Sequence, residues 1–505
     1  RLHRRRIIER LDDQIFRFTP AHKTMMTGAG EGYFSAFAVF LKASAPQVAL
    51  LASLPPLLAS FCQLFAVYLG QHFKARRSIV VVGALLQAVA LFCVAMLPVF
   101  YQNVPFSVLL LLVVIYFGGA HLGAPLWGSL MGAIVPANVR GSFFGARTRL
   151  SSIASFSALI VAGIVLQIFD FSELTRWGFT VIFLLGVVAR IVSAFHLQQI
   201  HDPPHEASIA GDVTSLFQRG FLKGQSRFLR FSLFFALMQG SVAISGPLIA
   251  IYLLRDLEFS YLELTINTAA SVLMQFLVLQ RWGRLSDLFG NRIILRTTGF
   301  GIALIPLTWT LSTDFYYLLA VQALSGLLWS GFSLSAANFV YDLTEQDKRA
   351  GLMALHAVLA AIGVFVGATF GGWLAVLLPK DISLMGIEFS WASAIYGVLV
   401  ISALARLIIA MMFLPRLMEV RDVRRMSYSG LLFRVTRFSP VSGVIFEVVN
   451  RRPRKKTAEQ TGKADVDAEI RAETDSEAGS ETISRNTEAT SDQAGAAEDS
   501  DKSQT

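Results

Sequence analysis

Charged residues are scarce in this chain, and their scarcity excludes an ordinary soluble protein. Only 16% of the 505 residues are Asp, Glu, Lys or Arg, against roughly 25% in soluble domains. Hydrophobic residues make up 54% and include 40 Phe, and they form long blocks such as residues 107–136. Because about 20 apolar residues cross the bilayer core as a helix, the composition predicts a multi-pass membrane protein.

Cysteines and catalytic motifs are also rare. The two cysteines, Cys62 and Cys93, stand in apolar blocks without CxxC or Cys/His spacing, which predicts small buried side chains rather than a disulfide or a metal site. The chain contains no GxSxG, HExxH or GxxxxGKS/T pattern. We therefore expect no enzyme, no metal and no cofactor. Residues 1–22 are basic and lack the apolar core of a cleaved signal peptide.

Twelve apolar segments are long enough to predict membrane-spanning helices. Lys and Arg alternate between the connections, with 23 in the N-terminal segment and the even-numbered connections and 4 in the others. Positive residues favour the cytoplasmic side, so both termini are predicted to be cytoplasmic. The predicted spans cover about 23–42, 46–69, 78–101, 105–135, 148–169, 177–198, 230–254, 260–281, 292–312, 315–341, 350–378 and 389–414.

The connections and the C-terminal region divide the chain into six parts. Residues 415–456 mix Arg with short apolar runs, which favours a segment lying on anionic lipid over a partly folded cytosolic tail. Residues 457–505 hold 13 acidic and 4 basic residues, a composition typical of disorder. Without this tail the formal net charge rises from +9 to +18, which suits a membrane-facing protein and gives no evidence for nucleic acid. The predicted parts are the N-terminus 1–22, a six-helix bundle 23–198, a central loop 199–229, a second bundle 230–414, the juxtamembrane segment 415–456 and the acidic tail 457–505.

Short matching stretches recur in the two halves of the membrane region. Arg140-Gly141 and Arg349-Ala350 each occupy a fourth-to-fifth connection, and Glu31-Gly32 and Gln239-Gly240 each fall in a first span. An Ala-Arg pair, containing Arg190 in one half and Arg406 in the other, ends the sixth span of each half. Together these matches predict two homologous six-helix bundles, an arrangement that secondary transporters use with substrate sites near the midplane.

The segment GRLSDLFGNR, residues 283–292, resembles the loop signature of the major facilitator superfamily. The resemblance covers roughly residues 20–414 and implies an all-helical fold of two pseudo-symmetric six-helix bundles. The first-half copy departs from the signature, because His72 and Ala75 stand where its acid and second glycine belong. By resemblance, Asp287 contacts the other bundle and Arg349 and stabilises one of the two access states, as a conformational latch. The residues assigned to the latch are Gly283, Arg284, Asp287, Gly290, Arg292, Arg349 and Arg140.

Glu31 is the one acid outside the tail predicted to lie in the middle of a span. A charge at the bilayer centre costs at least about 2.5–3.5 kcal/mol, so an embedded acid is the first candidate for a proton carrier. The alternative is a neutral Glu that bonds to the backbone or to a neighbouring helix. Gly28 and Gly32 around it have the small-xxx-small spacing of closely packed membrane helices.

The family fold implies a central cavity lined by the first and fourth helices of each bundle. His121 could share a proton with a carboxylate. Trp127 and Trp329 could stack on a substrate. The alternative for all three residues is a structural contact within the helix bundle. Arg190 and Arg406 are predicted to be structural and to extend toward the headgroups. The predicted cavity residues are Glu31, Tyr33, His121, Trp127, Gln239, Trp329 and Asn338.

The leading functional hypothesis is a secondary transporter of a small solute, coupled to protons through Glu31. It is expected to act as a monomer among membrane lipids, in the plasma membrane and most simply the bacterial inner membrane. A lipid translocase, a receptor that does not transport and an intramembrane enzyme using Glu31 and His121 are the alternatives. The substrate and the direction of transport stay open.

Overall fold

A computed structural model describes most of the membrane region, within one compact unit of residues 1–432. The described residues are 21–73, 76–100, 104–135, 140–200, 224–344, 348–378, 381–384, 387–390 and 393–419. The predictions for residues 1–20, for most of the central loop and for the chain after residue 419 lie outside them.

The first half is helical throughout the described residues. Its core is aromatic, with Phe37 and Phe183 in edge-to-face contact at 5.2 Å between ring centroids. Short connections make successive helices antiparallel, so α5 and α7 begin at one end of the bundle and α4, α6 and α8 at the other. The elements are α2 (Ala21–Ala29), η1 (Glu31–Tyr33), α3 (Phe34–Phe40), α4 (Ala45–Phe73), α5 (Arg76–Phe100), α6 (Phe106–Ile134), α7 (Arg140–Phe171) and α8 (Thr175–Gln198).

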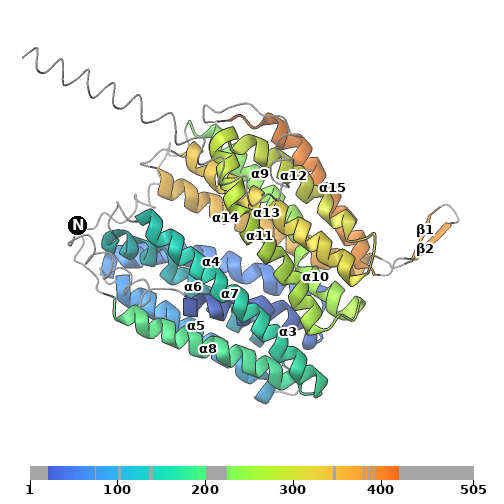
Figure 1. Ribbon diagram of the computed structural model, residues 1–505, viewed down its shortest axis with the longest axis horizontal. Coiled ribbons are helices and arrows are strands. Elements are labelled where there is room, and N and C mark those ends of the chain that lie inside the picture. Colours follow the sequence, from blue (N-terminus) through green and yellow to red (C-terminus); the bar gives the residue numbers. More distant parts are fainter. Residues whose placement is uncertain are drawn as a thin grey trace, which may run out of the picture. The chain divides into compact units, whose positions relative to one another are not determined.

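The second half repeats this arrangement (Figure 1). We call the end where α5, α7, α12 and α14 begin the basic end, because it carries most of the Arg and Lys, and the other the far end. The elements are α9 (Ser226–Ala243), η3 (Gly246–Leu248), α10 (Ile249–Ile251), η4 (Tyr252–Asp256), α11 (Tyr261–Phe289), α12 (Asn291–Thr308), α13 (Phe315–Leu343), α14 (Arg349–Leu377), β1 (Asp381–Leu384), β2 (Ile387–Ser390), α15 (Ile395–Phe413) and η5 (Leu414–Arg416).

Helices occupy each of the twelve predicted ranges, but the described residues hold ten that are long and apolar enough to cross a membrane. The two remaining ranges are 21–40, where the helix is broken, and α12, which is 18 residues long and carries Arg292 and Arg296. The count of twelve spans and the cytoplasmic termini therefore stay predictions.

The first helix of each half is interrupted at mid-length, which the sequence-based expectation of continuous helices did not include. In the first half, α2 ends at Ala29 and Glu31 opens the 3₁₀ turn η1. In the second, α9 ends at Ala243 and the 3₁₀ turn η3 begins with Gly246 and Pro247. Proline has no N–H to donate and disrupts the regular ladder. At membrane depth such irregular backbone is tolerated where it is buried in protein or lines a cavity.

Glycines on α14 bring its backbone against α9. A Cβ atom on Gly367 would lie 1.9 Å from the carbonyl oxygen of Gly240, and one on Gly371 would lie 1.8 Å from that of Ile244. Gly363 contacts Ala236 in the same way, one turn earlier. This spacing of four residues lets two membrane helices pack closely, and it fixes α9, with its broken end, against α14.

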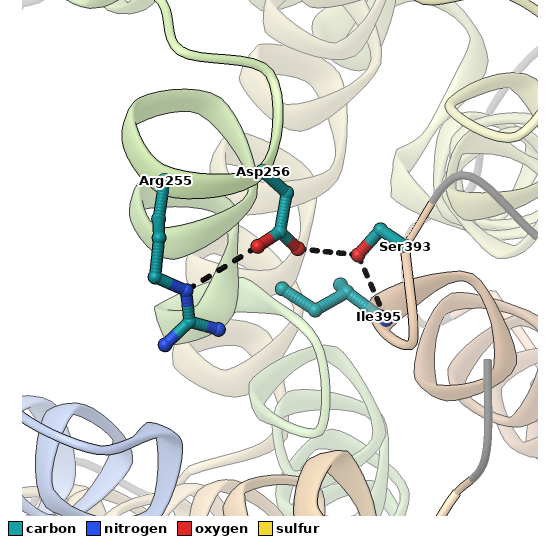
Figure 2. A network of polar contacts seen from close by, with 4 residues as sticks. All are labelled: Arg255, Asp256, Ser393 and Ile395. Carbon is teal, nitrogen blue, oxygen red and sulfur yellow. Dashed lines mark hydrogen bonds and ion pairs between the residues drawn. The ribbon is translucent and has the colours of Figure 1, made fainter.

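The β1–β2 hairpin is the element that the all-α expectation omitted. Its strands are antiparallel, with Asp381 opposite Ser390. Beside it, at the far end, Asp256 accepts hydrogen bonds from the Arg255 Nε (3.3 Å) and from the Ser393 hydroxyl (Figure 2). Ser393 Oγ in turn accepts from the Ile395 N–H at 3.0 Å. The network fastens the end of η4 to the start of α15.

Candidate functional site

A cavity of about 170 Å³ lies between the two halves, where the broken first helices meet. It is lined by Gly32 and Tyr33 of η1, by Ile249 and Ala250 of α10, and by side chains of α11 and α13. α3 of the first half also contacts α10 of the second (Figure 1). The helix breaks thus expose backbone to a space shared by both halves, as in transporters whose discontinuous helices form the substrate site.

Asn267 is the polar side chain of this cavity with the greatest unmet bonding capacity. It is fully buried, and neither its amide nitrogen nor its amide oxygen has a hydrogen-bond partner among the described residues. Burying an unpaired amide costs free energy, so Asn267 is poised to bind a solute or ordered water. The sequence interpretation did not include it because the predicted cavity lining came from the first and fourth helices of each bundle, whereas Asn267 lies on α11, the second span of its half.

Tyr33 connects the two halves directly. Its hydroxyl donates to the carbonyl oxygen of Leu159 in α7 at 2.7 Å and can accept from the hydroxyl of Thr265 in α11, 2.8 Å away. The Thr265 hydroxyl has the carbonyl of Tyr261, one turn earlier, as a second acceptor at 2.7 Å, so its single hydrogen is shared between the two. Tyr33 therefore lines the cavity and links the two halves on the side of the cavity toward the far end.

Other contacts hold the halves together toward the far end. The side-chain oxygen of Gln167 accepts a hydrogen bond from the backbone N–H of Leu262 at 3.0 Å. Gly163 packs on Thr265 so closely that a Cβ atom would lie 2.2 Å from its hydroxyl oxygen. On the other side of the interface, Gly372 packs against Ala49. In this conformation the far end is joined by packing and by hydrogen bonds.

Tyr33→Phe is expected to loosen the far end. One net hydrogen bond contributes about 0.5–1.5 kcal/mol, so the population opened at the far end should rise roughly two- to tenfold. The opened population is measured with Ser35→Cys, a cysteine in the cavity, in a protein whose free Cys62 and Cys93 have been replaced. A membrane-impermeant maleimide is added from the far-end side, and its labelling rate is followed. Tyr317→Phe removes a bond within one half, to the carbonyl of Thr308, and should leave the rate unchanged. An equal rise in both variants would contradict the link.

Glu31 lies in the interior of the first half, next to the cavity. It is half-buried, and the Tyr116 hydroxyl donates to its Oε2 at 3.3 Å. The positive charge of Lys23, about two turns earlier in the chain, attracts the Glu31 carboxylate. Glu31 is therefore neither isolated in lipid nor neutralised by a close ion pair among the described residues.

The other predicted cavity residues separate into three groups. His121 and Gln239 each hold one buried polar atom, Nδ1 and Oε1 respectively, without a described hydrogen-bond partner, which leaves both available. Trp127 lies instead under Arg147, whose guanidinium is 4.0 Å from the ring centroid. Asn338 lies toward the basic end, where it donates to Ser286 and Asn291.

The placement of Trp127 and Asn338 differs from the predicted gathering around Glu31. Trp127 lies about two turns before the end of α6, and Asn338 little more than one turn before the end of α13, both toward the basic end. Trp329 lines a second cavity within the second half. The seven residues predicted for one cavity are thus spread along the length of the bundle.

The residues assigned to the latch lie at the basic end. Gly290 has φ of 84°, a left-handed backbone that favours glycine, and it ends α11 and precedes α12. Asp287 is exposed, with no bond to Arg349 among the described residues. Arg349 donates to Thr344 and stacks over the Tyr341 ring at 3.8 Å.

The rest of the latch set is less informative. Arg284 is exposed and Gly283 is half-buried. The backbone N–H of Arg292 donates to Glu419 Oε2 at 2.8 Å. The side chain of Arg140 lies outside what the structure describes. Latching between halves therefore stays a prediction for another conformation.

Arg190 and Arg406 differ from the prediction that they extend to the headgroups, because each is buried, at 5% and 4% exposure. Arg406 donates to the carbonyls of Ile302 and Val242 at 3.2 and 3.3 Å and to the Ser245 hydroxyl at 3.0 Å. The last carbonyls of a helix lack partners within the helix, so Val242 at the break in α9 offers an acceptor. Ile302 in α12 offers another, because the residue four positions later is Pro306, which has no N–H. These acceptors satisfy the buried guanidinium of Arg406.

Two membrane-spanning halves with broken first helices around a shared cavity define a helical transport-type fold, and comparisons with known proteins identify the family. A profile of the Major Facilitator Superfamily matches residues 24–246 and 231–427. The chain therefore belongs to this superfamily, which confirms the resemblance seen in the sequence.

Individual relatives match over shorter stretches. The chain is 31% identical over 106 residues to the major facilitator-type transporter psiT2 of Psilocybe cyanescens, 21% of this chain and 20% of that protein. It is 30% identical over 133 residues to the uncharacterized MFS-type transporter YqjV of Bacillus subtilis, 26% of this chain and 32% of that protein. The matched stretches thus span between a fifth and a third of these relatives.

Solved structures match over nearly the whole fold. The nucleoside transporter NupG has a TM-score of 0.60 at 13% identity, covering 80% of this chain and 98% of that one. A bacterial homolog to the human lysosomal transporter Spinster, inward-facing and occupied, has a TM-score of 0.61 at 14% identity, covering 85% and 99%. At such identities the likeness establishes the multi-pass helical fold and leaves the substrate open.

Proposed function

We propose that this protein is a secondary transporter that moves a small solute by alternating access and couples that movement to protons through Glu31. The observation that carries the proposal is the position of Glu31, which opens the 3₁₀ turn in α2–η1–α3 directly before Gly32 and Tyr33 of the shared cavity. Membership of the superfamily and the transporter fold support the same function.

The surroundings of Glu31 suit a group that gains and loses a proton. In the deprotonated form its carboxylate accepts from Tyr116 and is attracted by Lys23. In the protonated form its charge is removed from the interior, where an unpaired charge is costly. Because Tyr33, two residues later, bonds to α7 and α11, a change at Glu31 can alter the far-end contact. Protonation and opening would then be linked through η1.

Transport tests the proposal directly. The purified protein is placed in liposomes with an inward proton gradient and a pH-sensitive dye inside. Sugars, nucleosides, amino acids and organic acids are then added outside in turn. Proton entry should depend on the presence of one class of solute. A protonophore should abolish the accumulation of that solute. Flipping of labelled lipid without solute uptake would instead support a lipid translocase, and ligand binding without flux a receptor.

The location and the assembly remain parts of the proposal. The excess of Arg and Lys at the basic end supports placing that end in the cytoplasm, and the YqjV match to a bacterial protein suits a bacterial inner membrane. The cavity is lined by residues of a single chain, which suits a monomer that needs no partner other than solute, protons and lipid.

We also propose that Asp287, together with Arg349, contacts the first half and forms the latch when the basic end closes. Asp287→Asn should then shift the population toward the state open at the basic end by roughly two- to tenfold, as expected for one lost polar contact. Labelling of Ser35→Cys from the far-end side should slow accordingly. Arg349→Gln should slow it about as much, and the double variant should add little. Independent, additive effects of the two changes would contradict a shared contact.

A further inference from the structure

A second cavity lies inside the second half, around the break in its first helix. Its volume is about 310 Å³, and it shares Ile249 and Gln322 with the cavity between the halves. The two cavities therefore adjoin, and together they reach the lower size range of small-molecule sites, about 300–1,000 Å³. The second cavity is lined by Val242, Ser245, Gly246, Ile249, Ser271, Ile305, Pro306, Trp309, Gln322, Ser325, Trp329, Leu399 and Arg406.

Arg406 is the charged residue of this lining, and no Asp or Glu accompanies it. Its three hydrogen bonds go to two carbonyl oxygens and one hydroxyl, all neutral acceptors. Its Nε is buried without a partner among the described residues. Of the five N–H groups of a guanidinium, these three bonds leave two, including that of Nε. A buried charge is normally paired, so this cation lacks the anion that would compensate it.

The first half has a related buried cation that lines neither cavity. Arg190 donates from Nη1 to the Ser193 hydroxyl at 3.2 Å, and its Nε has no hydrogen-bond partner among the described residues. Arg406 differs because it lines the second cavity, whose described lining holds no acid. The negative charge that completes the second half can therefore come from a solute.

We propose that Arg406 binds the carboxylate of a small organic anion, with Trp329, Ser325 and Gln322 around its uncharged part. A guanidinium pairs with a planar carboxylate through parallel N–H donors. The free Nε–H would donate to one carboxylate oxygen, and the parallel donor on Nη2 becomes available when the carboxylate replaces one of its neutral acceptors, the Val242 carbonyl or the Ser245 hydroxyl. One cation suits a singly charged carboxylate better than a doubly charged phosphate. This assignment names the solute class of the proposed transporter. It rests on the proposed function, because it takes this cavity to be part of the solute pathway.

Equilibrium binding tests this assignment without any gradient. Benzoate and phenylacetate are titrated against the purified full-length protein, with benzamide, phenylacetamide and inorganic phosphate as comparisons, and the thermal unfolding midpoint is measured. The carboxylates should raise the midpoint saturably and the amides should not. Arg406→Gln should weaken carboxylate binding at least about tenfold, Arg406→Lys should retain part of it, and Arg190→Gln should bind as wild type does.

The wild-type comparison of acid with amide stands even if Arg406→Gln does not fold. Equal effects of acids and amides, no effect of either carboxylate, tighter binding of phosphate, or unaltered binding by folded Arg406→Gln would each overturn the assignment. Carboxylate binding without any proton-dependent uptake would overturn the transport proposal alone. Uptake of a neutral solute without carboxylate binding would overturn this assignment alone.

Discussion

Glu31→Gln is expected to abolish accumulation of the transported solute while leaving its binding intact. A gradient of one pH unit corresponds to about 1.4 kcal/mol and can hold about a tenfold accumulation if one proton moves with each solute. Gln cannot carry the proton but can still accept from Tyr116, which lies 3.3 Å from Glu31 Oε2. The ratio of inside to outside solute should therefore fall to about one, at an unchanged apparent affinity, in the liposome assay.

The matched control is Glu173→Gln, an exposed acid in the connection between α7 and α8. This change removes a carboxylate of the same half, far from the cavity lining, and should leave accumulation at the wild-type ratio. Full gradient-driven accumulation by folded Glu31→Gln would show that the coupling proton is carried elsewhere, with His121 the next residue to test.

Gly367→Ala is expected to cause a large loss of stability for the addition of a single methyl group. The new Cβ atom would lie 1.9 Å from the Gly240 carbonyl oxygen and 2.6 Å from its carbon. Backbone atoms cannot rotate away as a side chain does, so α14 and α9 must separate. Overpacking of this kind costs about 1–3 kcal/mol. The thermal unfolding midpoint in detergent should fall by several degrees, and solute-binding capacity should fall with it.

Gly128→Ala provides the comparison on α6. No atom lies within 4 Å of the position that its Cβ atom would take, and Ala is favoured over Gly within a helix by roughly 0.5–1 kcal/mol. The midpoint should stay constant or rise slightly. A fall as large as that of Gly367→Ala would mean that the close α9–α14 contact is not the cause.

Helix positions could be predicted well from the sequence because long apolar blocks leave few alternatives in a membrane. The breaks in the first helix of each half could not be predicted, because a continuous helix and an interrupted helix of the same sequence have the same hydropathy. Gly246-Pro247 was a local signal for the second break, whereas the glycines around Glu31 suggested close packing alone. The strands of the β1–β2 hairpin, DISL and IEFS, alternate polar and apolar residues, a strand pattern that the length rule for apolar membrane-spanning blocks does not detect.

Site residues were harder to predict because a helix position does not fix its depth or its partner. Tyr33 lines the shared cavity, whereas Asn338 bonds at the basic end. The burial of Arg406 depends in part on the Val242 carbonyl at the break in α9, and that break was not foreseen. Asn267 was missed because it lies on α11, the second span of its half, and the cavity was expected to be lined by first and fourth spans.

Distance measurements between the halves test alternating access linked to Glu31 most directly. Nitroxide pairs on Arg149 and Leu288 toward the basic end, and on Glu173 and Leu311 at the far end, use exposed positions. With solute present, acidification should shift the two distance distributions in opposite directions in wild-type protein and leave both unchanged in Glu31→Gln. The account would be contradicted if the distance distributions of the wild-type protein did not change with pH. It would also be contradicted if acidification shifted those of Glu31→Gln as much as those of the wild type.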